Sequence, residues 1–142
     1  HVHGIHASRQ QKKEAALGLL QDVGLPGGFF GRYPHEFSGG QRQRIGLARA
    51  LATGPELIIC DESVSSLDVS VQAQILNLLN DLKDRRKLTY LFISHDLSVV
   101  KYMADRIMVM KDGRLVEQGP ANELFRNPES GYTRELMDAI LD

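Results

Sequence analysis

The sequence lacks the features that mark several classes of protein. It has one cysteine among 142 residues, which excludes an internal disulfide framework and suits a reducing compartment. No apolar run approaches the roughly 20 residues needed to cross a bilayer, and the opening has no apolar segment typical of a secretory signal. The net charge is only −1, so the overall charge favours neither nucleic acid nor an anionic membrane. We therefore expect a soluble chain.

The opening residues also lack features that a complete chain would carry. The chain begins with His1 rather than methionine, and its first residues show no strand or cap signal. We therefore expect a piece of a longer polypeptide. His1, His3 and His6 could bind a metal, but a frayed terminus is favoured because no carboxylate or thiol lies nearby.

The pattern of apolar residues changes near residue 56. Before it, the spacing predicts a helix that ends at Gly24, a loop from Pro26 to Phe37, and a second helix from Gly40 to Thr53. After it, short apolar strands alternate with helices; the expected strands are 57–60, 89–94 and 106–110, and the expected helices are 71–86 and 96–103. Strands separated by helices imply parallel pairing, so we predict an α/β fold with a mostly parallel sheet flanked by helices.

The last part of the chain predicts a hairpin and two short helices. Asp112-Gly113 suits the positive backbone angles of a tight turn after the third strand. The residues from Pro120 to Asp142 are expected to form the two helices.

Polar residues follow two of the predicted strands directly. Asp61 and Glu62 come after the strand 57–60, and His95 and Asp96 come after 89–94. Ligands of parallel sheets collect beyond the carboxyl ends of the strands. Adjacent carboxylates there suit a nucleotide hydrolase, where one holds hydrated Mg²⁺ and the next orients and polarises the attacking water. The alternative is that polar residues simply emerge from the core at strand ends.

Ser38, Gly39, Gly40 and Gln41 stand at the start of the second predicted helix. A helix N-terminus carries unpaired N–H groups and a partial positive charge, and glycine lets backbone approach a phosphate closely. These four residues therefore predict a clamp for a γ-phosphate. Taken alone, they also fit an ordinary serine N-cap followed by a glycine-loosened turn.

The order of four motifs resembles the C-terminal half of an ATP-binding cassette (ABC) transporter ATPase domain, a P-loop NTPase. They are "FSGGQ" (Phe37–Gln41), "LIICDE" (Leu57–Glu62), "SSLD" (Ser65–Asp68) and the "H" of "ISHD" (His95). The resemblance makes them, in this order, the signature motif, the Walker B strand, the D-loop and the switch histidine. The wording of "YPHEFSGGQRQRIGLARAL" and of the tail "NPESGYTRELMDAI" is similar to ATPase subunits of bacterial dipeptide and oligopeptide importers.

The sequence departs from the family pattern in three places. Ser63 and Ser66 stand where proline and alanine are usual, and Ser130-Gly131 replaces a His-Pro pair in the tail. More important, no G-x-x-x-x-G-K-[ST] phosphate loop occurs, and that loop supplies the amide cradle and the lysine for the phosphates. We therefore expect this chain not to bind ATP well by itself and to be inactive alone.

The resemblance implies roles for the residues that match its motifs. Ser38, Gly39, Gly40 and Gln41 would grip the γ-phosphate of ATP bound by a partner, Asp61 would hold Mg²⁺ through water, and Glu62 would be the general base. His95 would contact the γ-phosphate and stabilise charge there, and Asp68 would act across the dimer. The implied cofactors are ATP and Mg²⁺.

The resemblance also implies partners, location and domains. The partners would be a second ABC ATPase domain, in a homo- or heterodimer, and transmembrane permease subunits, at the cytoplasmic face of the bacterial inner membrane. The function would be ATP hydrolysis coupled to peptide import; the alternative is a soluble mechanical ATPase of the same superfamily in translation or DNA repair. The expected parts are a helical subdomain (1–54), the second half of the ATPase core (55–119) and a C-terminal extension (120–142).

Other residues favour structural roles. Arg42, Arg44 and Arg49 suit a solvated or interfacial helix side better than a nucleic-acid face, so no nucleic-acid partner is expected. Cys60 is expected in the core. Phe29, Phe30 and Tyr33 are expected to pack, although their loop is also a candidate docking surface for a membrane partner.

Overall fold

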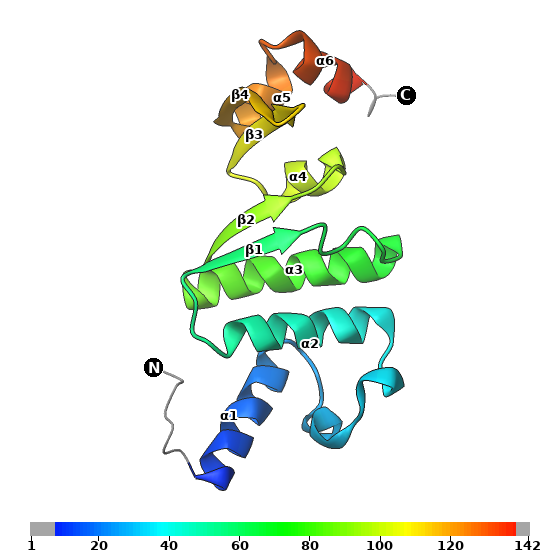
Figure 1. Cartoon of the computed structure of the whole chain (residues 1–142), viewed down its shortest axis with the longest axis vertical. Coiled ribbons are helices and arrows are strands. Elements are labelled where there is room, and N and C mark those ends of the chain that lie inside the picture. The colour runs from blue at the N-terminus through cyan, green and yellow to red at the C-terminus, as the bar shows by residue number, and fades with distance from the viewer. Residues whose placement is uncertain (1–7, 139–142) are drawn as a thin grey trace. The chain divides into compact units, whose positions relative to one another are not determined.

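A computed structural model describes residues 8–138, and the chain divides into two compact units between Leu91 and Phe92 (Figure 1). The expected boundaries after residues 54 and 119 stay a prediction. The histidines at 1, 3 and 6 lie outside the described residues. None of the helices within residues 8–138 combines the length and the apolar character needed to span a membrane.

The first unit contains the helices that the periodicity predicts. They are α1 (Arg9–Asp22), α2 (Gly39–Leu51) and α3 (Val69–Arg86). The segment between α1 and α2, expected as a loop, also contains two short 3₁₀ turns, η1 (Gly27–Gly31) and η2 (Pro34–Glu36). Such turns need only one or two local hydrogen bonds and no apolar periodicity, so the pattern gives no signal for them.

The helices of the first unit begin and end at residues suited to those positions. Ser8 caps α1, and its side chain and that of Gln11 form a capping box, so the expectation that the opening carries no cap signal was wrong. The Ser-x-x-Gln spacing from Ser8 to Gln11 was the available signal for this cap. The first turn of the helix has no apolar residues, so apolar periodicity does not mark the helix start. Gly24 and Gly54 follow α1 and α2 with φ of +69° and +64°, as expected of glycine after a helix.

Side-chain contacts join α1, α2 and α3. Arg44 of α2 donates from Nη1 to the carbonyl of Val23 at 2.8 Å. Asp22, at the end of α1, pairs with Arg85 at 3.7 Å and with Arg86 of α3. The buried apolar side chains of this unit are Val23, Leu25, Phe37, Ala48, Leu51, Ile58, Cys60, Val64, Ile75, Leu76, Leu78, Leu79, Leu82 and Leu88.

Strands β1 (Leu57–Asp61) and β2 (Thr89–Ile93) form a two-stranded sheet, joined through α3. Figure 1 shows them running in the same direction, as the crossover predicts. Along β1, Ile58 and Cys60 are buried, whereas Leu57 and Ile59 are exposed. One face of β1 is therefore covered, and its other face presents apolar side chains.

The second unit is built around a hairpin. It contains α4 (Leu97–Met103), β3 (Arg106–Lys111), β4 (Arg114–Pro120), α5 (Ala121–Arg126) and α6 (Gly131–Asp138). β3 and β4 pair antiparallel with Lys111 opposite Arg114. The turn between them has φ of +48° at Asp112 and +74° at Gly113, which confirms the predicted tight turn.

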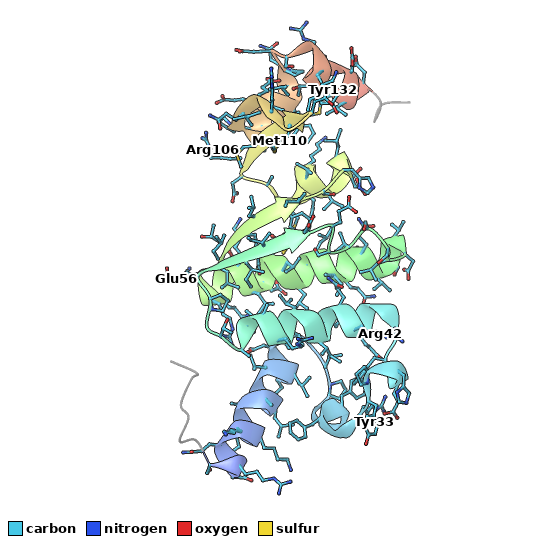
Figure 2. All side chains as sticks on the ribbon, in the orientation of Figure 1. Tyr33, Arg42, Glu56, Arg106, Met110 and Tyr132 are labelled. Atoms are coloured by element: carbon cyan, nitrogen blue, oxygen red, sulfur yellow. The ribbon has the colours of Figure 1, made fainter. Side chains whose placement is uncertain are left out.

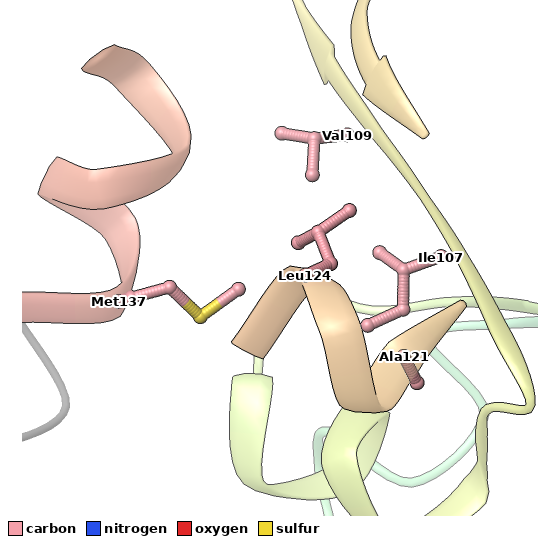
Figure 3. Packing of buried hydrophobic residues seen from close by; sticks show 5 residues of the cluster. All are labelled: Ile107, Val109, Ala121, Leu124 and Met137. Carbon is pink, nitrogen blue, oxygen red and sulfur yellow. The ribbon is translucent and has the colours of Figure 1, made fainter. Parts of the chain in front are cut away.

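The core of the second unit lies between the hairpin and its helices (Figure 3). It consists of Ile107, Val109, Ala121, Leu124 and Met137. Leu97 and Val100 of α4 pack against it. These contacts explain why the alternating side chains of β3 are buried at Ile107 and Val109 and exposed at Met108 and Met110.

The α/β class and the hairpin after the third expected strand are as predicted. Among the described residues, β1 pairs with β2 and β3 pairs with β4. A two-residue turn brings β3 and β4 together at little entropic cost, whereas the pairing of β3 with an earlier strand depends on tertiary placement.

Candidate functional site

The N-terminus of α2 is held by reciprocal side-chain hydrogen bonds. Ser38 is the N-cap; its Oγ accepts from the Gln41 amide at 3.4 Å, and Gln41 Oε1 accepts from the Ser38 amide at 3.1 Å. Ser38 and Gly39 are exposed. Ser38 therefore acts as an ordinary N-cap, as the alternative interpretation expects. The N-terminal end of α2, which carries a partial positive charge, stays open to solvent.

The two glycines at the start of α2 do not serve an unusual backbone angle. The described glycines with positive φ are Gly24, Gly54 and Gly113, so Gly39 and Gly40 have ordinary angles inside the helix. Alanine would favour the helix by roughly 1 kcal/mol per position. A close approach of another group, either a ligand or a neighbouring helix, would account for glycine at these positions.

The two predicted carboxylates stand at the end of β1. Asp61 is the last residue of the strand and Glu62 follows it, and both are exposed. Glu62 has φ of +45°, a left-handed conformation that costs an L-residue with a Cβ roughly 1–2 kcal/mol. The chain turns at this point because the amide and hydroxyl of Ser65 both donate to the Glu62 carbonyl, at 3.2 and 3.0 Å.

The donor chemistry of this strand end suits a hydrated magnesium ion. Mg²⁺ prefers oxygen ligands, keeps several waters and is commonly held by one or two carboxylates. Asp61 and Glu62 supply such oxygens, and the described residues contain no group of three or more His, Cys, Asp or Glu that could form an all-protein metal cage. The arrangement fits an ion bound mainly through water and substrate.

Asp68, the last residue of the predicted D-loop, begins α3. Its Oδ1 accepts from the Val71 amide at 2.9 Å, so the carboxylate is the N-cap of that helix. Val64 is almost fully buried between Glu62 and Asp68 and anchors the turn. The start of α2 and the turn from Asp61 to Asp68 both belong to the first unit.

His95 lies in the second unit, in the turn between β2 and α4, and is exposed. Its neighbours are fixed by hydrogen bonds: the Asp96 amide donates to Ser94 Oγ at 3.0 Å, and Asp96 Oδ1 accepts from the Ser98 amide at 2.9 Å as the N-cap of α4. Because Asp61 and Glu62 belong to the first unit, their meeting with His95 at one site stays a prediction.

Two of the three arginines of α2 bind inside the first unit. Arg42 Nε donates to the Phe37 carbonyl at 2.9 Å, and Arg44 bonds to Val23 and to Gln74 Oε1. Arg49 is exposed in the last turn of α2. Two guanidinium groups used for packing support the structural interpretation over a nucleic-acid face.

The aromatic segment before α2 is partly packed and partly open. Phe29 meets the buried Phe37 edge to face at 5.6 Å, and the Arg32 guanidinium lies 4.1 Å from the centre of the Phe29 ring. Tyr33, 67% exposed, stacks on His35 and projects from this segment (Figure 2). Packing is therefore shown for Phe29, whereas a docking role of the exposed rings stays a prediction.

Cys60 of β1 and Tyr90 of β2 are polar groups in a partly or fully buried environment. Cys60 is buried, as expected; burial raises the pKa of its thiol, against a smaller lowering by the Ser63 hydroxyl. Ser63 Oγ is itself buried without a hydrogen bond of standard geometry, so its contact with the thiol is weak. The Tyr90 hydroxyl donates to the Leu79 carbonyl at 3.1 Å, and burial, with the nearby Cys60, raises the pKa of Tyr90 to about 12.

A hollow of about 630 Å³ lies elsewhere on the first unit. It is lined by Arg9, Gln10, Lys12, Lys13 and Phe30, none of which belongs to the predicted site. Its wall is formed mainly by exposed side chains of α1, which lie away from the predicted site residues in the sequence, so we do not assign it to the site.

Two features of the site could not be predicted from the sequence. The left-handed angle of Glu62 has no sequence signal, because glycine or asparagine is the usual residue there. The contact of Gly40 with Val71 of α3 is also invisible in sequence, since the two residues lie on different helices. The capping box, by contrast, could have been found from the Ser-x-x-Gln spacing.

Comparison with known proteins identifies close relatives. Residues 3–65 match the family described as ABC transporter. The oligopeptide transport ATP-binding protein OppF of Bacillus subtilis (strain 168) is 55% identical over 139 residues, which cover 98% of this chain and 46% of that protein. The dipeptide transport ATP-binding protein DppF of Escherichia coli (strain K12) is 53% identical over 132 residues, covering 93% of this chain and 40% of that protein.

A solved structure is similar as well. A crystal structure of an ATP-binding cassette of an ABC transporter, in its ADP conformation, matches with a TM-score of 0.76 and 26% identity, covering 90% of this chain and 52% of that one. The chain therefore spans about half the length, or less, of the relatives it matches.

Proposed function

Because the chain belongs to the ATP-binding cassette family of transporter ATPases, we propose that it forms the C-terminal portion of the ATP-binding subunit of a bacterial peptide importer. The relatives at 53–55% identity are named for oligopeptide and dipeptide transport, which favours this function over a soluble mechanical ATPase. The subunit would bind permease subunits at the cytoplasmic face of the membrane and pair with a second ATPase domain.

The observation that carries the proposal is the backbone of Glu62. A glutamate with φ of +45° directly after an apolar strand is strained, and strain of this kind persists where function demands a particular side-chain position. The Glu62 carboxylate would accept a proton from the attacking water as that water bonds to the γ-phosphorus of ATP, while the bond from that phosphorus to the bridging oxygen breaks and ADP leaves. Asp61 would hold Mg²⁺ through water, and the ion would neutralise charge on the phosphates.

The other predicted residues would complete the site in a dimer. Ser38 and the first amides of α2 would donate to the γ-phosphate of ATP bound on the phosphate loop of the neighbouring domain. His95 would stabilise the charge that develops on that phosphate in its own domain. Asp68, which caps α3, would lie in the segment that faces the partner.

The test is a chimera in which this chain follows the N-terminal portion of the Bacillus subtilis relative, including a phosphate loop. We expect the chimera to hydrolyse ATP. Its Glu62→Gln variant should retain ATP binding but lose turnover by about a hundredfold or more, because the general base is gone, and should accumulate as a closed dimer in size-exclusion chromatography. Glu56→Gln, an exposed site just before β1, is the matched control.

Two results would count against the proposal. Normal turnover by Glu62→Gln would remove Glu62 from the base role. Failure of the active chimera to co-purify with the permease subunits of the importer would remove the transport assignment and leave a mechanical ATPase.

A further inference from the structure

Gly40 of α2 lies against Val71 of α3. A Cβ placed on Gly40 would lie 2.5 Å from Val71 Cγ1, well inside the closest separation of real side-chain carbons. A Cβ on Gly39 would lie 3.7 Å from Leu67 Cδ2, an ordinary contact. Of the two adjacent glycines, only Gly40 is therefore required by packing inside the unit.

The helices meet in parallel, with their first residues at the same end (Figure 1). The facing pairs advance in the same order along the chain: Gly39 faces Leu67, just before α3, Gly40 faces Val71, and Arg44 bonds to Gln74. Of the two pairs beside the N-caps, Gly40–Val71 is the tighter one. It therefore sets the separation of the start of α2 from the start of α3.

Val71 cannot easily move away from Gly40. Its side chain is branched at Cβ, and in a helix such residues have one strongly preferred rotamer. Its backbone amide is held by the Asp68 carboxylate at 2.9 Å, and the side chain is half-buried. A methyl group at position 40 would therefore displace the start of α2 rather than rotate Val71.

We propose that Val71 is a positioning residue, which sets the place of the nucleotide clamp Ser38–Gln41 relative to the turn that ends at Asp68. This inference rests on the proposed function, because it assigns the clamp to ATP. Gly40, the second glycine of the clamp, is needed because Val71 approaches it closely. This requirement is additional to any close approach of a phosphate. A misplacement of about 1 Å at such a site can lower turnover by as much as roughly a hundredfold.

The test is a double-mutant cycle with Gly40→Ala and Val71→Ala, measured in the ATPase-competent chimera and, for stability, in the 142-residue chain. Gly40→Ala should lower kcat by roughly tenfold to a hundredfold and leave KM for ATP within about twofold, since ATP binds mainly to the phosphate loop. Val71→Ala leaves room for the added methyl group. The double variant should therefore recover kcat to within about threefold of the unmodified chimera, because the two effects are coupled.

Gly46→Ala is the matched control, because Gly46 is also in α2 and has no atom within 4 Å of an added Cβ. It should leave kcat unchanged. If Val71→Ala does not rescue Gly40→Ala, the glycine is required by the nucleotide alone and the positioning role is wrong. If all variants lose stability and kcat in proportion, the contact is only structural. An inactive unmodified chimera would instead overturn the proposed function.

Discussion

Glu117 of β4 holds the start of α6 through its carboxylate. Oε1 accepts from the Glu129 amide at 2.8 Å and Oε2 from the Ser130 amide at 3.1 Å. The Thr133 hydroxyl, the Glu129 and Ser130 amides and the positive charge of Arg134 lower the pKa of Glu117. The Thr133 hydroxyl has no hydrogen bond of standard geometry, so we attribute the anchoring to the two amides.

The lowered pKa gives a pH prediction for this residue. A carboxyl whose pKa is lower in the folded state stabilises the fold above its ordinary value of 4.5 and loses that contribution as the pH falls through the lowered pKa. NMR titration should show the amide protons of Glu129 and Ser130 shifting with a midpoint below 4.5. The shift should disappear in Glu117→Gln.

Glu135→Gln is the control for this titration, since Glu135 is exposed on α6 itself. It should leave the midpoint unchanged. A midpoint at or above 4.5 in the unmodified chain would show that the two amide bonds do not stabilise the ionised form.

At the scale of elements, the starts of α2, α3 and α4 each carry a capping side chain. Ser38, Asp68 and Asp96 accept from the amides that follow them, which are otherwise unpaired. The predicted functional residues Ser38 and Asp68 therefore have a structural role in this chain. Any functional test of them has to separate the two roles.

Asp68 offers such a separation. Asp68→Ala should lower the free energy of unfolding by about 1 kcal/mol in urea denaturation, because α3 loses its cap, whereas Asp68→Asn should retain most of that stability. Ser70→Ala, an exposed position in the first turn of α3, is the control and should change stability by less than about 0.5 kcal/mol. Equal effects of Asp68→Ala and Ser70→Ala would show that the cap contributes nothing measurable.

At the scale of the whole molecule, β1 presents apolar side chains that nothing among the described residues buries fully. Leu57 and Ile59 are 52% and 61% exposed, although strands in parallel sheets are usually covered on both faces. This exposure agrees with a chain that spans less than half of its curated relatives. An exposed apolar face also favours association.

Adjacent residues of β1 test this exposure. Ile59→Thr should lower the binding of a hydrophobic dye to the isolated chain and change its free energy of unfolding by less than about 0.5 kcal/mol. Ile58→Thr is the comparison, because Ile58 is only 8% exposed and its replacement leaves a buried hydroxyl. It should destabilise the chain by about 2 kcal/mol or more. Equal destabilisation by both variants would mean that Ile59 is covered in solution.

The sequence by itself determined the elements and the family, because both depend on local spacing. Apolar patterns predicted the main helices and the strands, the Asp112-Gly113 pair predicted the hairpin turn, and four ordered motifs carried the resemblance to ABC ATPases. Only the tertiary structure decided the left-handed angle of Glu62 and the close approach of Gly40 to Val71. The approach of Gly40 to Val71 depends on how two helices pack against each other, and the angle of Glu62 depends on the turn that Ser65 closes on its carbonyl. The residue types at these positions predict neither feature.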